Sequence, residues 1–135
     1  MAGTREAMAR ARRVRKLLGG TLRQSAVIAA PGIVALKTMI HRLKEDHANA
    51  RRLAEGLVKL DALAIDLKAV QTNMVFADTS RLPFDAAELN RRLGRYQVEV
   101  LVGSPRRIRM VTHRHIQPEH VDRAIEAFKE VVKGA

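Results

Sequence analysis

The chain is organised around the stretch Arg15-Lys16-Leu17-Leu18-Gly19-Gly20-Thr21-Leu22-Arg23-Gln24, in which a pair of glycines joins two helical patterns. Lys16 and Arg23 stand on either side of this turn. Glycine lets a backbone approach a ligand closely, and a lysine with an arginine can hold a phosphate or a carboxylate. The turn therefore has the outline of an anion site. The alternative from spacing alone is that the glycines only end the first helix and both charges are solvated.

Length and composition indicate one globular domain, or a large part of one. A chain of 135 residues with a hydrophobic fraction of 47% can bury a packed core. The sequence has no cysteine, which excludes disulfides, thiolate metal sites and a cysteine nucleophile. No apolar run approaches the roughly eighteen residues of a membrane span. We therefore expect a cytoplasmic protein with no membrane partner.

The formal net charge of +11 raises the question of an anionic partner such as nucleic acid. Aromatic residues make up only 3% of the chain, so the stacking platforms of single-strand binders are missing. No zinc-finger spacing or RNA-recognition signature is present. We expect no nucleic-acid partner, and a non-catalytic basic interaction domain remains an alternative that salt-dependent binding to duplex DNA would favour.

Apolar spacing and capping residues predict a largely helical first part. Thr4 can cap a helix that runs to about Leu18. After the turn, a short helical piece leads to Pro31, which can open the next helix. The strongest periodicity predicts a long amphipathic helix from about Gly32 to Val58. Its apolar face is Leu36, Ile40, Leu43, His47, Ala50, Leu53, Ala54 and Leu57, and its polar face includes Arg42, Asp46 and Asn49.

After residue 58 the period changes from helical to extended. The predicted extended segments are 64–70, 71–77, 98–102 and 107–112. Asp85 can cap a helix that ends at Gly94, and Pro118 and Gly134 bracket a last helix. Extended segments that meet through tight turns and are flanked by helices predict an α/β (α+β) fold, with a small antiparallel or mixed sheet and helices on one side.

Arg109 is the first candidate binding residue. In the predicted strand 107–112, Ile108 and Met110 point to one face, so Arg109 points to the other. If the apolar pair meets the helices, Arg109 faces an opening, where an arginine can grip a carboxylate with two parallel hydrogen bonds. The alternative is an edge-strand arginine in solvent.

Histidines are the remaining chemistry-bearing residues. His113 and His115 lie two apart and His120 follows, so one strand face could present two metal ligands. No third ligand stands at a convincing spacing, and we predict no metal site. His47, on the apolar face of the long helix, is predicted to be a buried core histidine.

Five segments together resemble the low-specificity L-threonine aldolases, which are pyridoxal-phosphate enzymes of fold type I, the aspartate-aminotransferase-like fold. The segments are 15–24, Ser25 to Gly32, Leu43 to Arg51, Gln71 to Val75 and Ile108 to His113. They follow the family's order and cover nearly the whole chain. The usual family turn reads Gly-Gly-Gly-Met-Arg-Gln, and its third glycine and methionine are Thr21 and Leu22 here.

The resemblance implies that this chain is the C-terminal portion of such an enzyme. Residues 1–58 would hold the Gly-Gly turn and the long bridging helix, and residues 59–135 would form the C-terminal small domain with a three- to four-stranded sheet. The implied enzyme is a cytoplasmic homotetramer of glycine biosynthesis and threonine catabolism. It cleaves L-threonine or L-allo-threonine, which are β-hydroxy-α-amino acids, to glycine and acetaldehyde.

The resemblance also implies a role for three residues. Arg109 would bind the α-carboxylate of the substrate, and Lys16 and Arg23 would reach a neighbouring subunit's cofactor phosphate or substrate carboxylate. The family's Schiff-base lysine stands in a Ser-Lys-Gly segment that this sequence does not contain. We therefore expect no catalytic residue in this chain and no activity of the chain alone. The alternative is another β-eliminating pyridoxal-phosphate lyase. The two enzymes are distinguished by their product, which is an aldehyde for the aldolase and pyruvate for the β-eliminating lyase.

Overall fold

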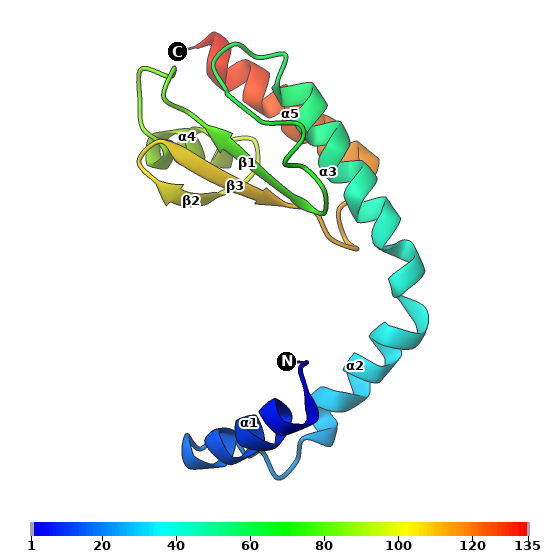
Figure 1. Ribbon diagram of the computed structural model, residues 1–135. Coiled ribbons are helices and arrows are strands. Elements are labelled where there is room, and N and C mark those ends of the chain that lie inside the picture. The colour runs from blue at the N-terminus through cyan, green and yellow to red at the C-terminus, as the bar shows by residue number, and fades with distance from the viewer. Residues whose placement is uncertain (1, 135) are drawn as a thin grey trace. The chain divides into compact units, whose positions relative to one another are not determined.

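The computed structural model describes residues 2–134, which form two compact units that meet between Ile40 and His41. The elements in chain order are α1 (Arg5–Leu17), α2 (Ala26–Thr38), the 3₁₀ helix η1 (Ile40–Arg42), α3 (Leu43–Leu57), β1 (Met74–Asp78), α4 (Ala86–Gly94), β2 (Leu101–Ser104), β3 (Arg107–Val111) and α5 (Pro118–Lys133) (Figure 1). The predicted α/β class is confirmed.

The first unit begins with the capped helix that the sequence predicts. The Thr4 hydroxyl accepts a hydrogen bond from the Ala7 N–H at 3.3 Å, and Gly19 has a φ of 73° directly after the helix. The prediction that Pro31 opens the next helix is wrong, because α2 already begins at Ala26 and Pro31 lies inside it. The carbonyls of Gln24 and Ser25 accept the first hydrogen bonds of α2, so the helix has started before the proline.

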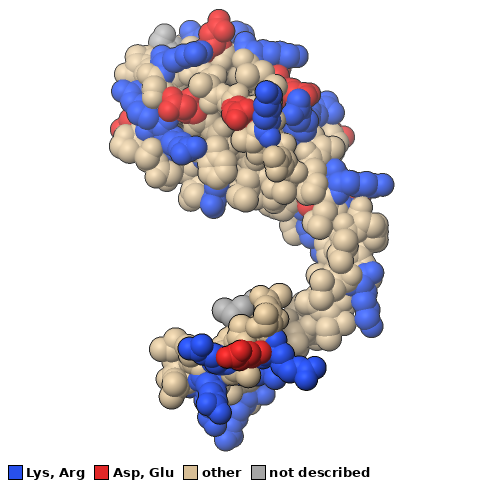
Figure 2. Space-filling view, in the orientation of Figure 1, with Lys and Arg blue, Asp and Glu red and all other residues tan. Residues whose placement is uncertain are grey.

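No residue of α1 or α2 is buried. Large apolar side chains on both helices are open to solvent, among them Leu17 at 84%, Val27 at 75% and Leu36 at 70% exposure. Glu6 is the one acidic residue of this unit. On the face that Figure 2 shows, its Lys and Arg side chains alternate with uncharged surface. Among the described residues 2–40 there is therefore no hydrophobic core.

Among residues 2–134, no single helix meets the length and hydropathy of a membrane span. The bent pair α2 and η1–α3 meets them jointly, by length and composition alone.

The predicted continuous helix from Gly32 to Val58 is wrong. Helix α2 ends at Thr38, residues Ile40–Arg42 form a 3₁₀ turn, and α3 starts at Leu43. The Thr38 hydroxyl donates to the carbonyl oxygen of Val34 at 2.8 Å, and such a bond from a helical threonine to the preceding turn bends helices. The boundary between the two units lies at this break. The domain boundary expected at residue 58 remains a prediction.

The second unit contains a three-stranded antiparallel sheet in the order β1-β3-β2. Strand β1 pairs with β3 from Met74↔Val111 to Asp78↔Arg107, and β2 pairs with β3 from Leu101↔Arg109. The sequence predicts an extended segment at 64–70, yet these residues contribute only an isolated bridge from Ala64 to Asp78. The second strand starts at residue 101 rather than 98 because the N–H groups of residues 98 and 100 donate hydrogen bonds to acceptors on α4.

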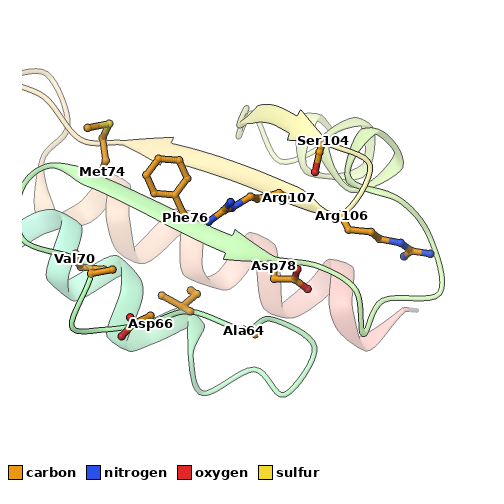
Figure 3. Close-up of a pocket in the computed structure, with 11 residues that line it drawn as sticks. Ala64, Asp66, Val70, Met74, Phe76, Asp78, Ser104, Arg106 and Arg107 are labelled. Carbon is orange, nitrogen blue, oxygen red and sulfur yellow. The ribbon is translucent and has the colours of Figure 1, made fainter.

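Helices α3, α4 and α5 lie on one face of the sheet (Figures 1 and 3). The capping predicted for α4 and α5 is confirmed. The Asp85 side chain accepts from the Glu88 N–H, and Pro118 is the first residue of α5. The core between the helices and the sheet includes Leu53, Leu57, Val75, Leu89, Ile108, Val121 and Phe128, all buried.

The predicted buried face of α3 is confirmed at Ala50, Leu53, Ala54 and Leu57 and is wrong in the first turns of the helix. Asp46 and Asn49, which the periodicity assigns to the polar face, are only 4% and 7% exposed, whereas Leu43 is 45% exposed. His47 is exposed, so its prediction as a core histidine is wrong. The buried stripe runs through Asp46, Ala50, Leu53 and Leu57. Its polar start is buried because Asp46 and Asn49 form hydrogen bonds with residues 112 and 116, which lie between β3 and α5.

Candidate functional site

The open face of the sheet carries the first candidate residue. The burial of β3 alternates so that Ile108 and Met110 are buried, while Arg109 is on the opposite face and half-buried. This confirms the predicted alternation. Arg109 stands between Phe76 of β1 and Leu101 of β2, which are its cross-strand neighbours. The guanidinium therefore emerges between two apolar side chains that are themselves 45% and 53% exposed.

The Arg109 side chain has no hydrogen-bond or ion-pair partner among the described residues 2–134, and its Nε atom is buried. A buried donor without a partner costs free energy, so the structure leaves this guanidinium ready for an acceptor. A carboxylate is the acceptor that matches the planar fork best. This geometry fits the predicted carboxylate grip.

Arg107, two residues earlier on the same face, has partners within the chain. Its guanidinium lies 5.5 Å from the centre of the Phe76 ring. It is paired across the strands with Asp78. The Ser80 backbone N–H donates to Asp78 and lowers the pKa of that carboxyl below its ordinary value, and the charge of Arg107 adds to this shift. The Arg107 guanidinium thus has partners within the chain, whereas that of Arg109 has none among the described residues.

A cavity of about 730 Å³ lies beside β1, between its open face and the segment 64–70 (Figure 3). Phe76, Asp78 and Arg107 line it. None of these three is among the candidates predicted from the sequence, although Met74, Phe76 and Asp78 alternate with buried Val75 and Ala77. Period-2 alternation along β1 was the signal that could have placed them beside Arg109.

Lys16 and Arg23 flank the Gly-Gly turn of the first unit. Lys16 is in the last turn of α1, and the Gly20 N–H donates to the Arg15 carbonyl at 2.8 Å. A Cβ on Gly20 would lie 2.9 Å from Arg15 Cγ, so a larger residue would need Arg15 to move. Both candidate cations are exposed, and neither side chain has a partner in the part of the chain that the structure describes.

The three candidate residues fall in different units. Lys16 and Arg23 belong to the unit that ends at Ile40, and Arg109 belongs to the unit that begins at His41. The structure therefore describes each residue within its own unit.

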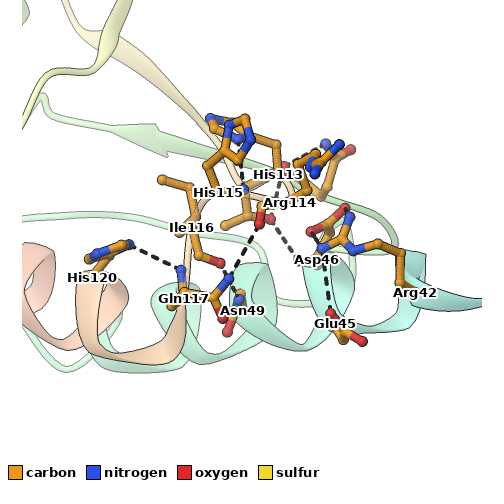
Figure 4. A network of polar contacts seen from close by, with 12 residues as sticks. Arg42, Glu45, Asp46, Asn49, His113, Arg114, His115, Ile116, Gln117 and His120 are labelled. Carbon is orange, nitrogen blue, oxygen red and sulfur yellow. Dashed lines mark hydrogen bonds and ion pairs between the residues drawn. The ribbon is translucent and has the colours of Figure 1, made fainter. Parts of the chain in front are cut away.

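A polar network fixes the end of β3 on α3 (Figure 4). The Thr112 hydroxyl donates to the Asp46 carbonyl at 2.6 Å, and the Asn49 amide donates to the Ile116 carbonyl at 2.8 Å. Arg42 donates two hydrogen bonds to the Asp46 carboxylate, at 2.8 and 3.1 Å. Since Thr112 follows Arg109 by three residues, this network holds the strand that carries Arg109.

The histidines near the start of α5 make local contacts. The rings of His113 and His115 meet edge to face with centroids 5.7 Å apart, and the His120 Nδ1 accepts from the Gln117 N–H. Within residues 2–134 no group of three or more His, Cys, Asp or Glu side chains is placed to hold a metal ion.

The fold and the open face define an α/β unit whose sheet presents an unpaired arginine suited to a carboxylate. A family model described as "Beta-eliminating lyase" matches residues 1–80. The chain therefore belongs to the beta-eliminating lyase family.

Relatives are similar over nearly the whole chain. The "Probable low-specificity L-threonine aldolase 2" of Arabidopsis thaliana is 35% identical over 130 residues, which cover 96% of this chain and 37% of the relative. The "Low specificity L-threonine aldolase" of Escherichia coli (strain K12) is 37% identical over 123 residues, which cover 90% of this chain and 34% of the relative. The chain thus spans about a third of the length of these curated relatives, and the resemblance to threonine aldolases is confirmed.

Proposed function

We propose that this chain is part of a pyridoxal-phosphate-dependent aldehyde-lyase that cleaves L-threonine or L-allo-threonine to glycine and acetaldehyde. The observation that carries the proposal is Arg109, an unpaired guanidinium with a buried Nε on the open face of the sheet. The similarity to threonine aldolases supports the reaction class.

In this proposal Arg109 binds and orients the α-carboxylate of the amino acid. A bidentate pair fixes two oxygens at once, so it holds the Cα–Cβ bond in one orientation. The Thr112–Asp46 bond helps by holding β3 in place. Phe76 and Leu101, on either side of Arg109, keep water from part of the guanidinium and strengthen the pair.

The proposed cofactor is pyridoxal 5'-phosphate, and the cations of the Gly-Gly turn suit its phosphate. Lys16 and Arg23 are exposed, unpaired among residues 2–134 and next to a turn that a glycine closes at positive φ. We propose that they act across a subunit boundary in a homo-oligomer, a tetramer. When bound, the cofactor supplies the electron sink for Cα–Cβ cleavage.

The lysines of this chain do not fit the Schiff-base role. None stands in a Ser-Lys-Gly segment, and Lys129 and Lys133 pair with Glu126 and Glu130 on the surface of α5. Among the described residues, no lysine lines either of the two cavities beside the sheet. We therefore propose that residues 1–135 alone do not catalyse the cleavage and that the lysine comes from outside this sequence.

The test is an assay of the protein that contains this sequence, purified from its source and supplied with pyridoxal phosphate. Acetaldehyde released from L-threonine or L-allo-threonine is expected, measured by coupled oxidation of NADH with alcohol dehydrogenase. Pyruvate in place of the aldehyde would support β-elimination, which the family's description makes the second candidate. Absence of both products would overturn the proposal.

Arg109→Ala tests the carboxylate grip in that same protein. Loss of a charge-assisted pair worth about 1.5–3 kcal/mol should raise KM for the amino acid roughly ten- to a hundredfold. The matched control is Arg107→Ala on the same strand face, which should change KM by less than about threefold because Arg107 has partners of its own. Equal effects of the two variants would contradict the assignment.

A further inference from the structure

A second cavity, of about 500 Å³, lies in the unit that begins at His41, between residues 97–101 and helix α5. Its volume falls in the range of small-molecule sites. Of the residues that line it, Arg109 binds the carboxylate in the lyase reaction proposed above, and Leu101 and Thr112 only support Arg109 there.

The cavity exists because residues 97–100, which precede β2, do not pair with β3. Pairing of β2 with β3 stops at Leu101↔Arg109. The Val98 N–H donates to the Leu93 carbonyl at 3.2 Å, and the Val100 N–H donates to the Asn90 side chain at 2.9 Å. These bonds hold the segment on α4. Among the described residues, Met110 and Val111 therefore pair with β1 alone and have no strand partner on the other side of β3.

The opposite wall is α5, which is tied to the start of the same segment. Arg123 of α5 donates to the Gln97 side-chain oxygen at 2.5 Å. Gln97 has a φ of 60°, a left-handed conformation, directly before the segment that is held on α4. The two walls are therefore held by specific hydrogen bonds on either side of the opening.

The lining combines an apolar interior with a basic rim. Buried or half-buried apolar side chains include Met110, Val121, Ala124 and Phe128. The polar lining residues include Arg109, Arg123, His113 and His120, with Gln97 and the single carboxylate of Glu99. A ligand that matches this lining has an apolar body and one negative charge.

Hydrogen bonds set which nitrogen of each histidine can donate. The His113 Nδ1 accepts from the His115 N–H at 3.3 Å, and the His120 Nδ1 accepts from the Gln117 N–H at 3.1 Å. A neutral imidazole whose Nδ1 accepts carries its proton on Nε2. Both rings therefore keep an Nε2–H donor for an anion even when they are uncharged.

We propose that this cavity binds a small monocarboxylate with an apolar tail. The tail packs on Val121, Ala124 and Phe128, and the carboxylate accepts hydrogen bonds at the basic rim. The site consists entirely of residues of this chain, so its binding can be measured independently of the lyase proposal.

The test is a titration of the full chain at pH 7 with butanoate, hexanoate and octanoate, in which binding is detected by calorimetry and by amide NMR shifts. An apolar interior should tighten binding about fourfold for each added methylene group. Octanamide, which has the same tail without the charge, should bind at least about tenfold more weakly than octanoate. Equal binding across the series, equal binding of the amide, or no binding would each overturn the proposal.

Two variants place the ligand in this cavity. Ala124→Phe fills the interior and should weaken octanoate binding at least about tenfold, whereas the control Ala69→Phe, in the cavity beside β1, should leave it unchanged. Glu99→Gln removes the acid at the rim and should tighten binding roughly two- to fivefold, a gain that misfolding cannot produce. Equal loss in Ala124→Phe and Ala69→Phe, or no gain in Glu99→Gln, would overturn the site. None of these variants alters Arg109, so the outcome is separate from the test of the lyase.

Discussion

A methyl group added at Gly56 probes how α3 and α5 pack. A Cβ built on Gly56 would overlap Cδ1 of Ile125 on α5 and would lie 2.8 Å from Cγ1 of the same side chain. Carbon atoms pack favourably at about 3.5–4.0 Å, so both contacts are repulsive. Ile125 is only 9% exposed and is branched at Cβ, which leaves it few other rotamers. The two helices must move apart, or Ile125 must leave its rotamer.

The magnitude follows from two opposing effects. Overpacking of a filled core costs about 1–3 kcal/mol, and replacing glycine by alanine inside a helix returns about 1 kcal/mol. Because two carbon atoms of Ile125 are involved, the cost should lie in the upper part of that range. The expected net loss in the free energy of unfolding for Gly56→Ala is about 1–2 kcal/mol, or a fall in Tm of roughly 5–15 °C.

The assay is thermal and urea unfolding followed by circular dichroism at 222 nm, repeated in the Ile125→Ala background. Ile125→Ala alone should cost about 2–5 kcal/mol. In that background the clash is gone, so Gly56→Ala should be neutral or should stabilise by up to about 1 kcal/mol. A higher Tm for Gly56→Ala in the otherwise unchanged chain, or the same loss in both backgrounds, would refute the reasoning.

Three further predictions concern hydrogen bonds of the second unit. Hydrogen bonds from Arg91 and its neighbour lower the pKa of Glu88 to about 2, so this carboxylate contributes stability above about pH 4.5 that is lost as the pH falls towards 2. Glu88→Gln should therefore reduce the pH dependence of the free energy of unfolding in that window, and an unchanged pH profile would contradict this. Thr112→Val removes the bond to the Asp46 carbonyl from a side chain that is 3% exposed and should cost about 1–2 kcal/mol in urea unfolding, whereas unaltered stability would show that the bond contributes nothing. Asp85→Ala removes the cap of α4 and should cost about 0.5–2 kcal/mol, with Asp85→Asn as a control that keeps the accepting oxygen and most of the stability.

The helix ends predicted from sequence are correct where the signal is local. Thr4 and Asp85 cap their helices, and Pro118 begins α5, because each acts on backbone groups within one turn of itself. The prediction for Pro31 is wrong because a proline marks a helix start only when no earlier residue has nucleated the helix.

The period of α3 gives its buried face correctly at Ala50, Leu53, Ala54 and Leu57, but not in the first turns of the helix. Leu43 and His47 continue an apolar pattern but are exposed, while Asp46 and Asn49 are buried. Asn49 bonds to a carbonyl 67 residues further along the chain, and the Asp46 carbonyl accepts from a threonine 66 residues away. A helical stripe that contains polar residues is recognised only when these distant partners are known.

Arg109 shows which part of a binding site a sequence can reveal. Alternation along a strand decides which face a residue occupies, so the apolar neighbours at 108 and 110 are enough to place Arg109 on the open face. Whether an arginine on that face is available depends on residues from other strands. Arg107 shares the face but lies against Phe76 and opposite Asp78, whereas Arg109 has no partner among residues 2–134. The difference between the two arginines comes from the register of β1 on β3, which periodicity does not encode, and it is this register that makes Arg109 the carboxylate-binding candidate.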